Sequence, residues 1–225
     1  DMLPGVTLSP SRPDTTHFSV IDSEGNLAAV TQTVNLPYGN AVVVPGTGFL
    51  LNNEMDDFSV KPGVPNAFGL VGEDANAIAP GKRPLSSMSP TIVYGPDGKV
   101  VLAVGSAGGK RIIMHVTKTL VGVLDFGLPL KEAIALPNIY FGGGSLLVEE
   151  NTALANALDM IAAFGQQVKP ADLGSKVNGV QLVEGKWTGA ADPRSEGTAI
   201  MLNARGRVVS RTGNAAEDAP GTTVH

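Results

Sequence analysis

The amino-acid sequence predicts a mixed α+β protein in which helices cover sheets, and two observations support this. Strand-like runs come first, helix-like runs follow in the middle, and strand-like runs return in the C-terminal third. This order differs from the regular strand–helix alternation of a doubly wound fold. In addition, a chain of 225 residues, 43% of them hydrophobic, can bury a core without disulfides or metals.

Two hairpins are predicted in the first half of the chain. His17–Ile21 and Leu27–Val34 are strand-like runs on either side of a turn-rich segment, residues 22–26. Thr91–Tyr94 and Lys99–Val104 flank a Pro-Asp-Gly turn in the same way. Each pair is therefore expected to form antiparallel strands.

A long irregular loop is predicted at residues 59–84, which contain four prolines and four glycines in 26 residues. Loops of this length inside a compact domain are usually functional, for example as lids. A short apolar run, Ala41–Val44, precedes the loop. Residues 1–14 carry three prolines with little periodicity, which is typical of a linker.

The middle of the chain predicts helices. Apolar residues recur at helical spacing in Arg111–Phe126, and further helices are expected at Leu130–Leu136 and Thr152–Phe164. Asn151 is the expected N-cap of the last of these. The strand-like runs of the C-terminal third are Val180–Val183, Ala199–Leu202 and Val208–Arg211.

Composition excludes several classes of function. The absence of Cys removes thiol catalysis, Cys-ligated zinc and disulfide frameworks, and no cofactor or metal site is predicted. A net charge of −5 with only 5% aromatic residues argues against nucleic-acid binding. No apolar run approaches the roughly 20 residues of a membrane span. The chain starts at Asp1 without a signal-peptide pattern or an initiating Met, so we expect a piece of a longer protein.

A Gly-rich segment, Gly105-Ser-Ala-Gly-Gly-Lys110, links a predicted strand to a predicted helix. Its spacing fits neither a Walker loop nor a dinucleotide-binding fingerprint. Backbone N–H groups in such a turn can stabilise an oxyanion, and a simple tight turn also fits.

Two polar clusters are candidates for substrate binding. Asn52-Asn-Glu-Met-Asp-Asp57 gathers three acids and two amides but lacks the spacing and the Gly of an EF-hand calcium loop. Its carboxylates fit either a substrate ammonium group or a solvated loop. The second cluster, Arg83-Pro-Leu-Ser-Ser-Met-Ser-Pro90, offers several hydroxyl groups.

No serine nucleophile can be assigned from motifs. A Gly-x-Ser-x-Gly elbow is absent from these clusters, and His17, His115 and His225 lie far apart in the sequence. His115 lies in an apolar helix-like run and is expected to be a core residue. Thr15 offers another route if the chain is cut before it. A freed α-amine has a pKa near about 7.7–8.0 and can take the proton of its own hydroxyl group.

An ordered set of longer motifs resembles the small subunit of γ-glutamyltranspeptidases. The resemblance covers residue 15 to about residue 202. The motifs are Thr15-Thr-His-Phe-Ser-Val, Pro45-Gly-Thr-Gly, Leu50-Leu-Asn-Asn-Glu-Met-Asp-Asp-Phe-Ser, Pro62-Gly-Val-Pro-Asn, Lys82-Arg-Pro-Leu-Ser-Ser-Met-Ser-Pro, Gly105-Ser-Ala-Gly-Gly and Asp192-Pro-Arg. The resemblance implies an N-terminal-nucleophile hydrolase fold, an αββα four-layer sandwich completed by a separate large subunit.

The resemblance also implies roles in catalysis. Thr15 would be the nucleophile that forms a γ-glutamyl ester, after the precursor cuts itself in front of this residue. Thr33 would orient the Thr15 hydroxyl group, with Asn35 nearby at the substrate. Gly108 and Gly109 would present backbone N–H groups to the tetrahedral oxyanion.

Further residues would bind the substrate or cover it. Glu54 and Asp57 would hold the α-ammonium group of the γ-glutamyl substrate, and Ser86 and Ser87 would hold its α-carboxylate. Phe68 falls in the lid-like loop, about residues 59–84, where relatives often place a gating Tyr.

The resemblance divides the chain at the Asp14–Thr15 bond, which would be the processing site. Residues 1–14 would be a pre-cleavage linker or the tail of the large-subunit portion, and residues 15–225 would be the small catalytic subunit. The large subunit of the same precursor would complete a heterodimer and supply an Arg that binds the substrate carboxylate, so this chain alone would be inactive. The expected location is periplasmic or secreted.

The function implied is hydrolysis and transfer of the γ-glutamyl group from glutathione and other γ-glutamyl amides. The acceptor would be water, an amino acid or a peptide. One alternative is a related cephalosporin acylase that removes glutaryl groups. Glutaryl has no α-ammonium group, so Asp57 favours glutamyl. Another alternative is a catalytically silent relative that binds γ-glutamyl compounds.

Overall fold

The structure is a computed structural model that describes residues 15–213. The expected linker at residues 1–14 and His225 lie outside the described residues. The chain forms two compact units. The loop unit contains Thr15 and residues 33–86, and the sheet unit contains residues 16–32 and 87–213.

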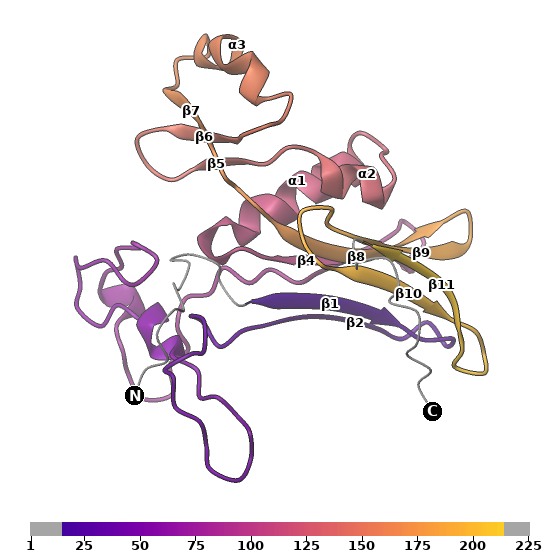
Figure 1. Cartoon of the computed structure of the whole chain (residues 1–225), viewed down its shortest axis with the longest axis horizontal. Coiled ribbons are helices and arrows are strands. Elements are labelled where there is room, and N and C mark those ends of the chain that lie inside the picture. Colours follow the sequence, from indigo (N-terminus) through magenta and orange to yellow (C-terminus); the bar gives the residue numbers. More distant parts are fainter. Residues whose placement is uncertain (1–14, 214–225) are drawn as a thin grey trace, which may run out of the picture. The chain divides into compact units, whose positions relative to one another are not determined.

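An antiparallel sheet in the order β3-β4-β8-β9 is the centre of the sheet unit. Its strands are β3 (Thr91–Tyr94), β4 (Val100–Ala107), β8 (Lys176–Val183) and β9 (Lys186–Ala191). Helix α1 (Ile112–Leu124) packs on β4, and helix α2 (Leu130–Ala135) packs on β8 and β9 (Figure 1). The helices therefore cover this sheet, as the sequence predicts.

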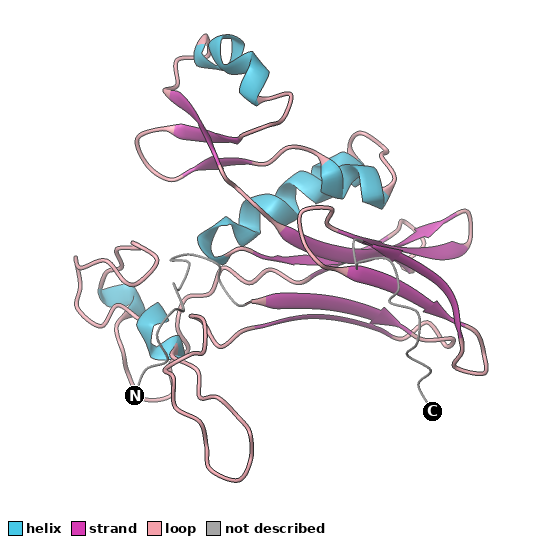
Figure 2. Cartoon of the chain, in the orientation of Figure 1, coloured by secondary structure: helices cyan, strands magenta, loops and turns pink. Residues whose placement is uncertain are grey.

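A second sheet layer lies against the first. Strands β1 (Thr16–Ile21) and β2 (Leu27–Gln32) pair from Thr16↔Gln32 to Ile21↔Leu27 and pack against β4 and β8. Figure 2 shows this hairpin and the helices on opposite sides of the central sheet. The sheet unit thus has a helix layer followed by two sheet layers.

The hydrophobic core fills the space between the central sheet and the helices. Leu102 and Val104 of β4 meet Ile112 of α1 and Ile134 of α2, and all four are at most 1% exposed. Gly122 lets α1 and α2 approach closely, because a Cβ there would be 2.9 Å from the Ala133 Cβ. Apolar burial on this scale is the main source of stability in such a domain.

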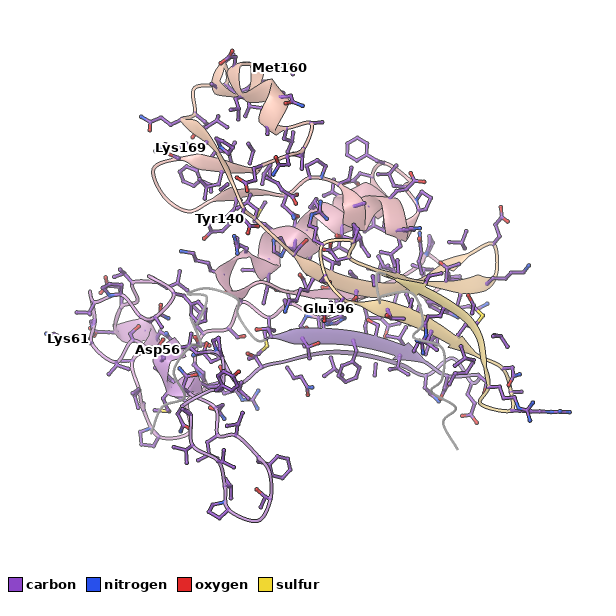
Figure 3. All side chains as sticks on the ribbon, viewed as in Figure 1. Asp56, Lys61, Tyr140, Met160, Lys169 and Glu196 are labelled. Carbon is purple, nitrogen blue, oxygen red and sulfur yellow. The ribbon has the colours of Figure 1, made fainter. Side chains whose placement is uncertain are left out.

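Smaller elements complete the sheet unit. Strands β5 (Ile139–Phe141), β6 (Leu146–Glu149) and β7 (Val168–Ala171) form a sheet accompanied by η4 (Ala155–Ala157) and α3 (Leu158–Ala162). Tyr140, Met160 and Lys169 mark this part in Figure 3. Strands β10 (Thr198–Leu202) and β11 (Val208–Gly213) form a hairpin that contacts β9.

Most of the predicted elements are confirmed, with small shifts in their ends. One prediction is wrong, because residues 152–164 contain only the short η4 and α3 instead of a continuous helix. Asn151 does not cap this helix, since its φ of 59° places it in a left-handed turn. A further difference is that β4 continues through Ala107, so the Gly-rich turn begins only at Gly108.

The loop unit contains little regular structure. It has the 3₁₀ turns η1 (Glu54–Asp57), followed by η2 (Asp74–Asn76), with isolated bridges such as Ser59↔Ala77. Hydrogen bonds between side chains and the backbone replace the backbone pairing of a sheet. Asn66 accepts from the Leu70 backbone N–H, and Asn76 donates to the Asp57 carbonyl oxygen at 2.7 Å. The predicted irregular loop at residues 59–84 is confirmed as irregular, and such hydrogen bonds fix its course.

Candidate active site

Thr15 lies in a protected position next to Thr33. Its side chain is 6% exposed, and its Oγ1 donates to Thr33 Oγ1 at 3.2 Å. The pair continues the register of the β1–β2 hairpin, whose last pair is Thr16↔Gln32. The hydroxyl group of Thr15 is therefore held in one direction by a second hydroxyl group.

Asn35 and Asn53 extend this network. The Asn35 backbone N–H donates to Thr33 Oγ1 at 2.8 Å, and the Asn35 side chain donates to the Asn53 carbonyl oxygen at 3.2 Å. Asn35 has a φ of 75°, a left-handed conformation that Asn tolerates better than most residues. Asn53 Oδ1 in turn accepts from the Leu36 backbone N–H at 3.0 Å. A chain of hydrogen bonds thus runs from Thr15 to the residue before Glu54.

Glu54 and Asp57 form a desolvated acidic pair on η1. Burial, followed by the charge of Asp57, raises the pKa of Glu54 to about 7. Burial also raises the pKa of the Asp57 carboxyl group, and the Asp56 charge adds to this, while a hydrogen bond with Glu54 opposes it. Glu54 Oε1 is buried without a hydrogen-bond partner among the described residues. Two crowded carboxyl groups with a free buried oxygen favour a cationic ligand.

The loop at residues 59–84 is attached to the same acidic turn. Asp56 accepts from the Ala67 backbone N–H at 3.0 Å, and Asn66 donates to the Asp56 carbonyl oxygen at 3.3 Å. Phe68 is half-buried beside this attachment, and its backbone N–H donates to Asn66 Oδ1 at 3.0 Å. A movement of this loop would therefore be transmitted to η1.

The remaining predicted residues are distributed over both units. Ser86 is an exposed residue of the loop unit, whereas Ser87 is half-buried and belongs to the sheet unit. Gly108 and Gly109 follow β4 in the sheet unit, with φ values of 145° and 57°. Side chains rarely adopt either conformation, so both positions require Gly.

The loop unit thus brings together Thr15, Thr33, Asn35, Glu54 and Asp57, and Phe68 and Ser86 belong to the same unit. Sequence reasoning assigned no role to Asn53, Asn66 or Asn76, which connect these residues. The feature of the sequence that could have indicated them is their side-chain amide group. An amide can donate and accept hydrogen bonds at the same time, so it can replace the missing backbone pairing in an irregular loop.

The arrangement can present an oriented hydroxyl nucleophile and a receptor for a cation. Among residues 15–213, no group of three or more His, Asp or Glu side chains could hold a metal ion. None of the described helices is both long and apolar enough to cross a membrane.

A family model described as γ-glutamyltranspeptidase matches residues 6–202. The chain belongs to the γ-glutamyltranspeptidase family. It is 46% identical over 198 residues to a glutathione hydrolase proenzyme of Escherichia coli and 45% identical over 195 residues to one of Pseudomonas aeruginosa. These matches cover 87% and 84% of this chain but only 34% of each relative, so the chain spans about a third of their length.

Solved structures of the family have the same fold. The Helicobacter pylori γ-glutamyltranspeptidase T380A mutant is 45% identical with a TM-score of 0.75, and the match covers 80% of this chain and 100% of that one. A γ-glutamyltranspeptidase from Pseudomonas nitroreducens complexed with L-DON has a TM-score of 0.74 at 41% identity, with 84% and 100% covered.

More distant neighbours show the fold alone. A cephalosporin acylase from Bacillus halodurans is 21% identical with a TM-score of 0.66, covering 80% of this chain and 32% of that one. The expected fold, that of N-terminal-nucleophile hydrolases, is thus confirmed together with the family.

Proposed function

We propose that this chain is the catalytic part of a γ-glutamyl hydrolase and transferase that uses Thr15 as its nucleophile. The substrates are glutathione and other γ-glutamyl amides, and the acceptors are water, amino acids or peptides. The observation that carries the proposal is the buried Thr15 hydroxyl group, which donates to Thr33 at 3.2 Å in a chain of the γ-glutamyltranspeptidase family.

The reaction begins when Thr15 Oγ1 attacks the γ-carbonyl carbon of the substrate. The α-amine of Thr15 takes the hydroxyl proton, and backbone N–H groups of Gly108 and Gly109 stabilise the oxyanion. Collapse of the tetrahedral intermediate breaks the amide bond, and the leaving amine takes a proton. The γ-glutamyl ester of Thr15 then transfers to water or to an acceptor amine.

Substrate selection rests on the charges of the glutamyl group. Glu54 and Asp57 bind its α-ammonium group, a role supported by their crowding and by the unpartnered Glu54 Oε1. Ser86 and Ser87 bind its α-carboxylate, a role that follows from the family motif. Phe68 belongs to the lid over the substrate, and the hydrogen bonds of the loop to Asp56 support a coupling between lid and receptor.

The active protein contains a second segment. The relatives are about three times as long as the matched region and are named proenzymes, which supports a precursor cut at the Asp14–Thr15 bond. The family match begins at residue 6, so it runs across this bond. The segment before the cut then forms the large subunit of a heterodimer. We include a periplasmic or secreted location in the proposal, which cell fractionation tests.

The test uses the complete precursor, produced as wild type and as Thr15→Ala. Wild type should release a chain whose first residue is Thr15, seen by intact mass, and should then cleave γ-glutamyl anilides. Thr15→Ala should remain uncut and inactive. Thr16→Ala is the matched control, because Thr16 is an exposed neighbour on β1 and should retain both activities.

Mass analysis of wild type incubated with a slowly turned-over γ-glutamyl amide adds a direct readout. The chain beginning at Thr15 should gain the mass of one γ-glutamyl group, and the adduct should be absent from Thr15→Ala. A wild-type precursor that never yields a chain starting at Thr15, or a Thr15→Ala protein that cleaves these amides equally well, would refute the proposal.

A further inference from the structure

The last peptide of β4 is held by two buried side chains that the reaction itself does not use. Ser106 Oγ donates to the Ala107 carbonyl oxygen at 2.7 Å. His115, on α1, places Nδ1 at 3.3 Å from the same oxygen and at 3.3 Å from Ser106 Oγ. Ser106, Ala107 and His115 are each at most 1% exposed, so water does not compete for these hydrogen bonds.

Because a peptide unit is planar, these contacts of the Ala107 oxygen also fix the direction of the Gly108 N–H group. The carbonyl group of Ala107 and the N–H group of Gly108 belong to one planar peptide, and none of the described peptide bonds is cis. In a trans peptide the two groups point in opposite directions. Fixing the Ala107 oxygen towards Ser106 and His115 therefore fixes the Gly108 N–H on the opposite side.

We propose that Ser106 and His115 are positioning residues that aim the Gly108 N–H group at the oxyanion of the reaction. This inference rests on the proposed function, in which Gly108 is an oxyanion donor. Ser106 and His115 contact no substrate; they act only through the Ala107–Gly108 peptide.

The fit of the His115 ring beneath the turn supports this role. A Cβ on Gly108 would lie 2.7 Å from His115 Cε1 and 2.9 Å from Nδ1, so the ring lies directly against the Gly108 backbone. His115 is itself a buried residue of α1. The ring is thus attached to a helix, and the helix is anchored in the core through Ile112 and Val116.

The protonation state of His115 suits a donor to a carbonyl group. Burial lowers the pKa of His115 to about 4, and the nearby cations Arg111 and Lys118 add to this, while the Ala107 carbonyl group and Asp192 oppose it. The imidazole is therefore neutral at physiological pH and carries one proton. The Ala107 oxygen can only accept, so the proton belongs on Nδ1.

The experiment compares substitutions that remove or keep each hydrogen bond in the complete, matured enzyme. Ser106→Ala removes one donor. His115→Leu removes the other, whereas His115→Asn keeps an N–H donor near the position of Nδ1. Thr119→Val is the matched control, because it removes a buried hydrogen bond to the backbone of the same helix, Thr119 Oγ1 to the His115 carbonyl oxygen, and touches neither the His115 ring nor Ala107. Rates are divided by the concentration of chains that begin at Thr15, measured by intact mass.

Removing a donor from an oxyanion site lowers kcat by about 100- to 1,000-fold. A Gly108 N–H group that points in a different direction should lose part of this effect. We therefore expect Ser106→Ala and His115→Leu to lower kcat/KM by about 10- to 100-fold. His115→Asn should recover most of the loss. Thr119→Val should retain wild-type kcat/KM even if its melting temperature falls.

Two ligands separate positioning from general damage to the site. A glutamate analogue with a γ-boronic acid becomes tetrahedral on the Thr15 hydroxyl group and should bind Ser106→Ala and His115→Leu more weakly, in proportion to the loss of kcat/KM. Free glutamate lacks a tetrahedral oxyanion and should bind all variants equally. If neither variant matures, the two segments are produced as separate chains, the second starting at Thr15, and compared in the same way.

The experiment distinguishes failure of the proposed function from failure of this inference. A wild-type enzyme without γ-glutamyl activity would overturn the proposed function. An active wild type whose Ser106→Ala and His115→Leu variants keep full kcat/KM and full affinity for the boronate would overturn this inference alone, as would equal weakening of glutamate and boronate.

Discussion

The acidic pair on η1 allows the proposed substrate class to be tested by Asp57→Asn. In the empty site burial and the neighbouring Asp57 charge raise the pKa of Glu54 to about 7. The substitution keeps the size of the side chain but removes one of the two charges that face a substrate ammonium group. Hydrogen bonds to charged groups contribute about 1.5–3 kcal/mol, which corresponds to about 10- to 150-fold in affinity. We expect KM for a γ-glutamyl anilide to rise by this factor, with a smaller change in kcat.

The raised pKa of Glu54 determines in which direction KM changes with pH. A raised carboxyl pKa means that the empty site favours the protonated acid, and the ammonium group binds only when Glu54 has lost this proton. KM of the wild type should therefore fall as the pH rises through about 7. In Asp57→Asn burial still raises the pKa of Glu54 but the Asp57 charge no longer adds to it, so this transition should move to lower pH.

The assay measures kcat and KM of the matured enzyme for γ-glutamyl and glutaryl anilides between pH 5 and 9. Glutaryl anilide has no ammonium group, so its KM should not rise in Asp57→Asn. Asp56→Asn, at the neighbouring position labelled in Figure 3, is the comparison variant: it removes a carboxylate of the same turn that accepts from Ala67, so its effect measures the loop contact and not the binding of an ammonium group. Equal losses for both anilides in Asp57→Asn, or a wild type that prefers glutaryl, would refute the reasoning.

Two further predictions concern the stability of the sheet unit. Gly105→Ala should lower the free energy of unfolding by about 1–3 kcal/mol, because its Cβ would overlap the His17 ring, and urea denaturation checks this. Arg194→Met should lower it by about 3–5 kcal/mol, because the buried carboxylates of Asp192 and Glu149 would both lose their ion pair with the guanidinium group. Lys99→Met, which breaks the exposed pair with Asp97, should cost less than about 1 kcal/mol, and equal effects of the two substitutions would contradict the argument.

The hairpins and α1 could be predicted because their apolar residues recur with the period of a strand and of a helix, respectively. The strands β5, β6 and β7 could not, because they are three or four residues long and lack alternation. Residues 152–164 were expected to be helical because apolar residues recur there at helical spacing. The left-handed turn at Asn151 and the 3₁₀ turn η4 leave only five residues in α3.

The resemblance implies that Thr33 lies beside Thr15, and the register of the β1–β2 hairpin explains why they meet. Ile21 pairs with Leu27, and stepping outwards by one residue on each strand leads to Thr16↔Gln32 and then to Thr15 and Thr33. No such rule connects Thr33 to Asn53, because the loop between them has no periodicity. The family motif predicts that Glu54 and Asp57 bind an ammonium group, but only the folded loop shows that burial raises the pKa of both carboxyl groups.

The alternation along β4 connects β1, the strand after the proposed nucleophile, with the proposed oxyanion turn. Gly105 faces the hairpin, where a Cβ would overlap the His17 ring, and the next residue, Ser106, faces His115 on the helix side. Two buried histidine rings therefore lie against the end of this strand, one on each face. Burial lowers the pKa of each to about 4, so both rings are neutral at physiological pH. His17 lies two residues after Thr15 and Gly105 three residues before Gly108, so the contact between His17 and Gly105 joins two chain segments that each lead, within three residues, to a proposed catalytic group.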